Sequence, residues 1–250
     1  MIELQEAQDG VAVLRMADGK ANAMSLEFCR TLTARFGEIG SSKARAVVMT
    51  GSGGIFSAGV DLIRLLDGGA PYVREFMPVL ATMFVAVFSC PKPVVAAING
   101  HAVAGGCVLA CAADRRLMAR EGGRIGTTEL AVGVPFPTVA IEIMRCAAAA
   151  HRFEEVIFGA AAYAPPEAVE RGLVHEIVEP DALIARAVVA AKALAALPPA
   201  AFALTKRQTR QPALARIARD ACAAEVEAIW TVPETAARIR DHVARTLRKA

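Results

Sequence analysis

Short apolar runs alternate with amphipathic stretches along the first two thirds of the chain. Residues 11–16, 46–49 and 94–98 are almost entirely apolar and are bounded by polar, glycine or proline residues, which is typical of buried strands. Residues 25–39 open on a serine and then repeat apolar residues at helical spacing, so we expect a capped helix. Residues 105–112 predict another helix. Strands that alternate with helices predict an α/β fold with a largely parallel sheet.

Glycine and proline predict where the helices between these strands begin and end. A short helix is expected after Gly59, and Pro71 is expected to open a longer one that runs to about Ser89. Pro91 and Pro93 then stop that helix, because proline lacks the N–H group that a helix interior needs.

The pattern changes at about Asp181, after which no strand is expected. Four helical segments follow, separated by Pro198-Pro199, Pro212 and Pro233. We therefore predict an α/β core over residues 1–190 and a helical C-terminal region over residues 191–250.

The chain of 250 residues is unusually apolar, at 55% with a mean hydropathy of +0.40, and much of the excess is alanine. This composition indicates that some helical surface is buried against other subunits. Residues 93–113 are long enough to span a membrane, but Asn99, His101 and several glycines lie at their centre, which favours a strand, a loop and a buried helix. The acidic start lacks a secretion signal, so we expect a cytoplasmic protein.

Cysteine and charge add little chemistry of their own. Cys107 and Cys111 would share a helix face, but no second pair or histidine cluster completes a metal site, and reduced thiols are expected at all six cysteines. Residues 182–250 hold 12 lysines and arginines against 5 aspartates and glutamates. Aromatic residues are sparse among these charges (Phe202 and Trp230), so solvated helix faces, or contacts with the phosphates of a nucleotide-bearing substrate, are favoured over nucleic-acid binding.

Two segments repeat one pattern, a buried strand that leads through a turn to Ala-Gly and into a helix. The first runs from Val47 to Leu62 and the second from Val94 to Val108. Backbone N–H groups at a strand-to-helix transition are free, and glycine lets a ligand approach them. If the two strands are neighbours, two N–H groups could bind one oxygen as an oxyanion hole. Tight packing and phosphate binding stay open as alternatives, although neither segment has the spacing of a dinucleotide-binding or phosphate-binding loop.

The same residues resemble the crotonase family of acyl-CoA enzymes. Residues 56–62 (FSAGVDL) and 92–106 (KPVVAAINGHAVAGG) are similar to the two oxyanion-hole signatures of that family, and residues 21–25 and 168–174 extend the similarity over nearly the whole chain. The resemblance implies a spiral of ββα units with C-terminal helices that assemble a homotrimer or a dimer of trimers. It also implies an acyl-CoA thioester as substrate, with no cofactor besides the coenzyme A of that substrate.

Site residues are carried over from the resemblance position by position. The N–H groups of Val60 and Gly105 match the two oxyanion donors. Substrate-binding positions match Lys20, Ala21, Ala23, Ala58, Gly59, Asp61, Leu62, Gly106, Val108 and Phe136, and Leu65, Leu66 and Phe84 are further candidates for the acyl pocket. Basic residues of the last helix are expected to help bind coenzyme A (Arg245, Arg248, Lys249). Asp61 is expected to brace its loop or cap the next helix, and His101 to pack rather than transfer protons.

Two departures from the hydratase pattern decide which reaction is expected. Hydratases of the family use two glutamates, and here Val108 stands at the first position while Glu129 matches the second. Residues 134–137 (VPFP) replace a glycine-rich turn. Both departures resemble the single-glutamate isomerases that convert 3-enoyl-CoA into 2-enoyl-CoA, because one base can move a proton between two carbons.

Several alternatives stay open at this point. Glu129 could merely favour the start of a helix. On the same scaffold the reaction could be a hydration with a displaced acid, a thioester hydrolysis or a decarboxylation. A chain that binds coenzyme A without catalysis is the alternative of a different class.

Overall fold

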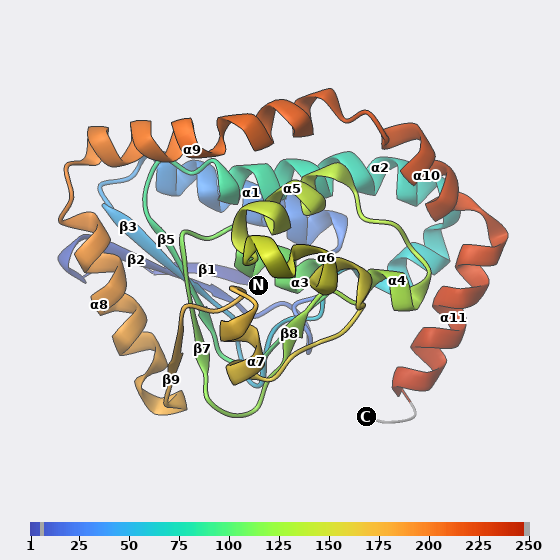
Figure 1. The fold of residues 1–250 in the computed structure, drawn as a ribbon, viewed down its shortest axis with the longest axis horizontal. Helices are drawn as coiled ribbons and strands as arrows, with labels where there is room; N and C mark the ends of the chain where they lie inside the picture. Colours follow the sequence, from blue (N-terminus) through green and yellow to red (C-terminus); the bar gives the residue numbers. More distant parts are fainter. Residues whose placement is uncertain (6–7, 248–250) are drawn as a thin grey trace.

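The computed structural model describes residues 1–5 and 8–247, and its centre is a six-stranded sheet (Figure 1). β1 pairs antiparallel with β2, and every other neighbouring pair is parallel. The mostly parallel α/β fold is therefore confirmed. The strands in spatial order are β1 (Ile2–Gln5), β2 (Val11–Met16), β3 (Ala46–Thr50), β5 (Val94–Ile98), β7 (Arg115–Ala119) and β9 (Glu176–Val178).

A second, smaller parallel sheet contains the strands that lead to the two Ala-Gly loops. It consists of β4 (Ile55–Ser57), β6 (His101–Val103) and β8 (Ile125–Gly126). Each of its strands follows a strand of the large sheet and precedes a helix, so the chain repeats a ββα unit three times. This repeat is the spiral that the resemblance implied.

Glycines let successive turns of the spiral stack with their backbones in direct contact. A Cβ atom on Gly100 would lie 1.8 Å from the carbonyl oxygen of Gly54, and one on Gly123 would lie 2.4 Å from the carbonyl carbon of Gly100. Real Cβ atoms never approach backbone this closely, so larger residues would separate the turns. The stacking fixes the small sheet, and with it the two loops.

The helices of the first half begin and end close to where the sequence predicts. In α1 (Leu26–Ser41) the Ser25 hydroxyl accepts a hydrogen bond from the Phe28 N–H at 3.1 Å, which caps the helix. α2 (Leu62–Phe88) is interrupted at Gly69, where φ is 58°, which confirms the predicted break before Pro71. The expected helix at residues 105–112 is α3 (Gly105–Cys111).

Among the described helices, α2 is long and apolar enough to cross a membrane. It packs along α1, and its apolar face is buried in the core (Val73, Phe76, Leu80, Met83, Phe84, Val87, Phe88). Core packing therefore accounts for its apolar face. Residues 93–113, in contrast, divide into β5, β6 and α3 and form no long helix.

The remaining helices follow the second sheet along the chain in two sets. Those before the C-terminal region are α4 (Glu129–Val132), α5 (Thr138–Ala147), α6 (Phe153–Phe158) and α7 (Pro165–Glu170), with short 3-10 turns at Gln8–Gly10, Ala150–Arg152 and Pro180–Ala182. The C-terminal helices are α8 (Leu183–Ala195), α9 (Pro199–Arg219), α10 (Ala223–Thr231) and α11 (Pro233–Leu247).

The four predicted C-terminal helices are present, but one expected boundary is wrong. Pro212 lies inside α9, and the break comes at Asp220, whose φ of 37° ends the helix. The expected division after residue 190 falls inside α8, which packs on the large sheet opposite α1 and α2 (Figure 1). From there α9 runs over α5, and α10 and α11 descend at the far end.

None of the six cysteines is paired in a disulfide in the structure. Cys29, Cys90, Cys107 and Cys111 are buried, whereas Cys146 and Cys222 are exposed.

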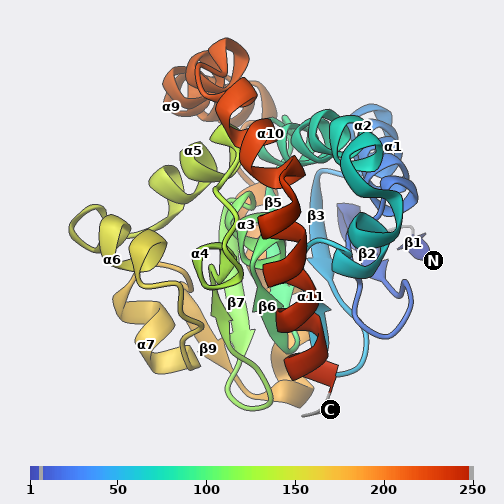
Figure 2. The same ribbon diagram turned by 90° about the vertical axis from the view of Figure 1, so that its right-hand side faces the viewer.

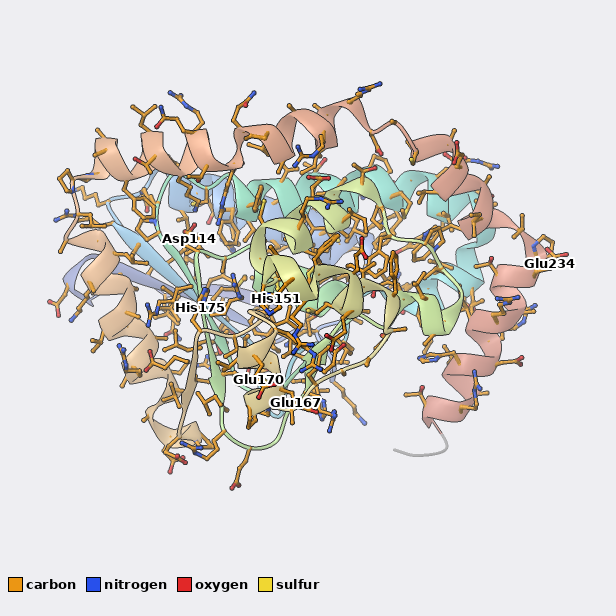
Figure 3. The ribbon with its side chains drawn as sticks, viewed as in Figure 1. Asp114, His151, Glu167, Glu170, His175 and Glu234 are labelled. Carbon is orange, nitrogen blue, oxygen red and sulfur yellow. The ribbon has the colours of Figure 1, made fainter. Side chains whose placement is uncertain are left out.

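A buried ionic cluster fastens α9 to the core. Asp114, labelled in Figure 3, accepts from Lys206 and Arg210 of α9 at 2.7 Å each and also from the Val94 N–H at 2.7 Å. The side chains of all three charged residues are at most 13% exposed.

Asp114→Ala is therefore expected to lower the free energy of unfolding by about 3–5 kcal/mol, because it leaves two buried cations without their counter-ion. Urea unfolding followed by circular dichroism measures this. Glu75→Ala is the matched control, since Glu75 and its partner Arg30 are both more than half exposed and their ion pair should contribute little. Equal losses in the two variants would contradict the assignment of Asp114 as an anchor.

Candidate active site

A cavity of about 300 Å³ lies where the two Ala-Gly loops meet α2, α4, α10 and α11. Its walls are mostly apolar, and its polar side chains are few (Asp61, Thr128, Glu129, His242, Thr246). An apolar pocket with a few convergent polar groups is the usual form of a small-molecule site.

The small sheet places the two loops side by side. β4 pairs with β6 in parallel, with Ser57 opposite Ala102, so both loops leave the same edge of the sheet. A Cβ atom on Gly59, which has a φ of 83°, would lie only 2.9 Å from the Gly105 backbone nitrogen. Only glycine fits at that position, and it brings the Val60 and Gly105 N–H groups to neighbouring places in one cavity wall.

The Val60 N–H group is the free donor of the first loop. Ala58, Gly59 and Asp61 donate their N–H groups within the chain, at 3.0, 3.2 and 3.1 Å respectively. Val60 donates to no acceptor in the described part of the chain. Three of the four N–H groups of residues 58–61 therefore hold the loop, and the remaining one, that of Val60, is available to a ligand.

The Gly105 N–H group is the free donor of the second loop. Gly105 is the first residue of α3, where an N–H has no acceptor within the helix. Ala104 before it has a φ of 50° and a ψ of −127°, a conformation that a residue with a Cβ rarely adopts. No acceptor for the Gly105 N–H occurs among residues 1–5 and 8–247.

Glu129 contributes a carboxylate with an unusual environment. It is the first residue of α4 and only 8% exposed, and it lines the cavity together with Val60 and Gly105. Its Oε2 atom is buried without a hydrogen-bond partner in the described structure. Burial raises the pKa of Glu129 to about 7, against a smaller opposing effect of the backbone N–H groups of Glu129 and Thr128. Near neutral pH the carboxyl group can therefore both take up and release a proton.

Two further cavity residues limit the chemistry. Val108 of α3 is fully buried and presents an alkyl group to the cavity. Asp61 lines the cavity as well, but its carboxylate accepts the Arg64 N–H at 3.0 Å and caps α2, as expected. Of these two carboxylates, Glu129 is thus the one with an oxygen atom, Oε2, that accepts no hydrogen bond in the described structure.

The other expected substrate-binding residues fall into three groups. Ala23, Ala58, Leu62 and the acyl-pocket candidate Phe84 line the cavity. Gly59 and Gly106 instead let the loops approach, since a Cβ on Gly106 would lie 2.1 Å from the Ser57 carbonyl oxygen. The remaining expected residues do not line the cavity (Lys20, Ala21, Leu65, Leu66, Phe136).

Phe136 and Lys20 show how those residues are placed instead. Phe136 is 8% exposed and packs into the main hydrophobic core. Lys20 is exposed in the turn before α1, and the carbonyl of the next residue, Ala21, accepts the Ala58 N–H of the first loop. Of the basic C-terminal candidates, Arg245 lies on α11, while Arg248 and Lys249 are outside the described residues.

His101 and His175 lie outside this cavity, and each accepts a hydrogen bond from a backbone N–H group. His101 is exposed, and its Nδ1 atom accepts the Arg124 N–H at 3.3 Å. His175, labelled in Figure 3, accepts the Arg116 N–H at 3.0 Å. Burial and the nearby Arg116 and Arg115 lower the pKa of His175 to about 4, so it is neutral at physiological pH.

Trp230 and His242 also line the cavity, and the sequence patterns did not reveal them. They come from α10 and α11, which pack against α2, and α11 also lies beside α4 (Figure 2). The pKa of His242 is lowered by burial and by Arg245. Only the folded arrangement brings these C-terminal residues to the two loops, so no local signal could have identified them.

Several known proteins are similar to this chain over most of its length. The model of the protein family described as enoyl-CoA hydratase/isomerase matches residues 6–238 of this chain. A putative enoyl-CoA hydratase of Thermus thermophilus is 32% identical over 210 residues, which cover 82% of each chain. The mitochondrial enoyl-CoA delta isomerase 1 of Mus musculus is 28% identical, over 82% of this chain and 72% of its own.

Solved structures agree with these sequence relatives. A probable enoyl-CoA hydratase of Mycobacterium tuberculosis superposes with a TM-score of 0.84 at 31% identity, over 90% of this chain and 95% of the other. The human mitochondrial delta3-delta2-enoyl-CoA isomerase superposes with a TM-score of 0.94 over 99% and 98% of the two chains. Its 23% identity makes it evidence for the fold alone.

Proposed function

The chain belongs to the enoyl-CoA hydratase/isomerase family of acyl-CoA enzymes, and we propose that it shifts the double bond of a 3-enoyl-CoA to the 2-position. The family resemblance expected from the two loops is thereby confirmed. The relatives include proteins named as hydratases and proteins named as isomerases. The choice between the two reactions rests on the cavity itself.

The observation that carries the proposal is a buried carboxyl group, whose Oε2 atom has no hydrogen-bond partner in the described structure, in the same apolar cavity as two free N–H groups. The thioester oxygen of the substrate would accept from Val60 and Gly105. Glu129 would take a proton from C2, and the negative charge of the resulting dienolate would lie on that oxygen. Glu129 would then return the proton to C4, which leaves a double bond between C2 and C3. One base suffices because both carbons lie along the same short segment.

Val108 is the reason for preferring isomerisation to hydration. Hydration needs a water molecule that is held and split between two polar groups, and the alkyl side chain of Val108 can neither hold it nor transfer a proton. Isomerisation consumes no water, so an apolar wall at this position protects the dienolate rather than hindering the reaction.

The coenzyme A portion would lie outside the cavity, along the turn that contains Lys20 and towards Arg245 of α11. Both side chains are exposed and positively charged, which suits phosphate groups. The C-terminal helices would assemble a homotrimer or a dimer of trimers, in keeping with the apolar composition.

The pH dependence should report the ionisation of Glu129. Its pKa of about 7 means that the carboxylate form, which can accept the C2 proton, is lost as the pH falls below 7. We expect kcat/KM for a 3-enoyl-CoA to rise with pH through an apparent pKa of about 7 and to decrease about tenfold for each unit below pH 6. A profile that stays flat down to pH 5 would contradict the assignment, provided that circular dichroism shows a folded protein throughout.

A deuterium-transfer experiment tests the single-base mechanism directly. 3-Hexenoyl-CoA that carries deuterium on both C2 positions is converted in ordinary water, and the product is analysed by NMR. If Glu129 alone moves the proton, part of the deuterium appears at C4 of the product. Deuterium lost from C2 with only solvent hydrogen at C4 would indicate either two bases or rapid exchange. Glu129→Asp, which keeps one carboxylate, should preserve the same transfer at a lower rate.

A further inference from the structure

Residues 21–24, which precede α1, are bonded to the first Ala-Gly loop on both sides of the Val60 N–H group. The Met24 N–H donates to the Gly59 carbonyl at 2.8 Å, and the Met24 carbonyl accepts the Asp61 N–H at 3.1 Å. The two bonds form an isolated parallel bridge between Met24 and Val60. They fix the residues immediately before and after Val60, so they determine where its N–H group points.

The side chain of Met24 reaches the second loop. Met24 is fully buried, and its sulfur atom would lie 3.2 Å from a Cβ atom placed on Gly105. Its backbone therefore bonds to the first loop, while its side chain packs against the residue that carries the second donor. A shift of residues 21–24 would change the positions of the two donors relative to each other.

Asn22 fixes this segment through its side-chain amide. The residue is only 2% exposed, its Nδ2 atom donates to the Phe56 carbonyl at 3.1 Å, and its Oδ1 atom accepts the Asp18 N–H at 2.8 Å. Its φ of 46° lies in the left-handed region, which asparagine tolerates better than most residues. The amide thereby joins the turn at Asp18 to β4, the strand that leads into the first loop.

The backbone carbonyl of Asn22 is bonded to the same loop. It accepts the Ser57 hydroxyl at 2.8 Å, and the Ser57 hydroxyl in turn accepts the Gly59 N–H at 3.2 Å. Ser57 is fully buried, so water cannot replace either bond. The side chain and the carbonyl of Asn22 therefore hold the first loop at successive residues, and the Val60 N–H group stays free.

We propose that Asn22 is a positioning residue for the oxyanion hole. Its amide holds residues 21–24 against the first loop, and Met24 then determines the places of the Val60 and Gly105 N–H groups. Asn22 does not itself line the cavity, so it acts through these neighbours. The inference rests on the proposed function in one respect, that the two N–H groups bind the thioester oxygen, and holds for any reaction that uses them.

The carbonyl stretch of a bound thioester reports on the oxyanion hole without catalysis. Hexanoyl-CoA that carries carbon-13 at the thioester carbonyl is bound to the purified protein at pH 8, and its infrared band is compared with that of the free ligand. Two hydrogen bonds should move the band to lower frequency, because they polarise the carbonyl group. Asn22→Gly, which permits the same φ and removes the side chain, should lose at least about half of that shift.

Turnover should decrease together with the shift. We expect Asn22→Gly to lower kcat by about 10–100-fold, because a small misplacement of the groups around the reacting atoms has effects of this size. The affinity for hexanoyl-CoA should change little, since the acyl chain still enters the same apolar cavity. A residue with a merely structural role would lower the stability of the protein without this difference between kcat and affinity.

Asn99→Ala is the matched control. The Asn99 side chain makes the same kinds of bond, accepting the Gly51 N–H at 2.9 Å and donating to the Gly53 carbonyl at 2.8 Å, but these bonds lie in the turn before β4. This variant should unfold more easily and keep the full shift. Asn22→Asp, whose ionised carboxylate cannot donate to the Phe56 carbonyl, should also lose the shift and replaces Asn22→Gly if that variant does not fold. A folded Asn22 variant with the full shift, or an equal loss in Asn99→Ala, would overturn the proposal.

The two proposals fail in different ways. Hydration of crotonyl-CoA by a protein whose Asn22→Gly variant loses the shift would overturn the proposed reaction and support the role of Asn22. Isomerisation of 3-hexenoyl-CoA together with a full shift in the variant would do the reverse. An unaltered protein that binds hexanoyl-CoA without any shift would contradict both the oxyanion hole and the role of Asn22.

Discussion

Glu129→Gln is expected to lower kcat for 3-enoyl-CoA isomerisation by about 10²–10⁴-fold, the range typical of a lost general base. Glutamine has nearly the same shape but cannot accept the C2 proton. Acyl-CoA affinity should change little, because the buried Oε2 atom has no hydrogen-bond partner among the described residues whose loss would disturb the cavity. Stopped assays of turnover and calorimetry of acyl-CoA binding measure the two effects separately.

Asp61→Asn is the matched control for this variant. Asp61 is the second carboxylate that lines the cavity, and asparagine can still cap α2. We expect its kcat to stay within a few-fold of the unaltered protein. If Asp61→Asn lost activity and Glu129→Gln kept it, the base would have been assigned to the wrong carboxylate.

Val60→Pro is expected to lower kcat by about 10²–10³-fold, since one oxyanion donor is typically worth about 2.7–4 kcal/mol in the transition state. Proline removes the N–H group, while the flanking loop bonds do not involve it: Met24 donates to the Gly59 carbonyl and Asp61 donates to Met24. The thioester oxygen would then keep only the donor at Gly105.

Val60→Ala separates the backbone from the side chain. It trims the cavity wall but keeps the N–H group, so its kcat should remain within a few-fold of normal. Thermal unfolding and hexanoyl-CoA binding of both variants establish that the loop is intact. Equal losses of kcat in the two variants would contradict the oxyanion role of the Val60 N–H.

Much of the fold follows from local pattern because its elements have strong local causes. β3 and β5 are buried along their whole length, and uninterrupted apolar runs predict such strands. Ser25 caps α1 by a bond three residues away, and Gly69 breaks α2 by its own conformation. Each of these features depends on residues close in the sequence.

The small sheet and the continuation of α9 through Pro212 depend instead on distant partners. β4, β6 and β8 have only three, three and two residues, too few for a hydrophobic pattern, and the stacked spiral holds them together. Pro212 remains inside α9 because that helix is anchored to the core through Lys206 and Arg210, four residues apart. Local propensity predicted a break there, and tertiary contacts overrode it.

The candidate site, too, could be predicted from the sequence only in part. Two glycine-bearing loops could be found from the sequence, but their contact depends on the pairing of β4 with β6. Phe136 was expected in the acyl pocket, yet in the segment 134–137 it is Val134 and Pro137 that face the cavity. Neighbours decide which side chains of a proline-rich turn point inwards. One such neighbour here is Trp230, which lies about 95 residues further along the chain.

The most direct test of the proposed reaction compares trans-3-hexenoyl-CoA and crotonyl-CoA in parallel spectroscopic assays of the purified protein. The single-carboxylate cavity predicts conversion of the first substrate to 2-hexenoyl-CoA and no hydration of the second, with the conversion abolished in Glu129→Gln. Hydration of crotonyl-CoA at a rate similar to or greater than the isomerisation would contradict the proposed reaction. It would show that a second polar group of the cavity performs the proton transfer that Val108 cannot perform.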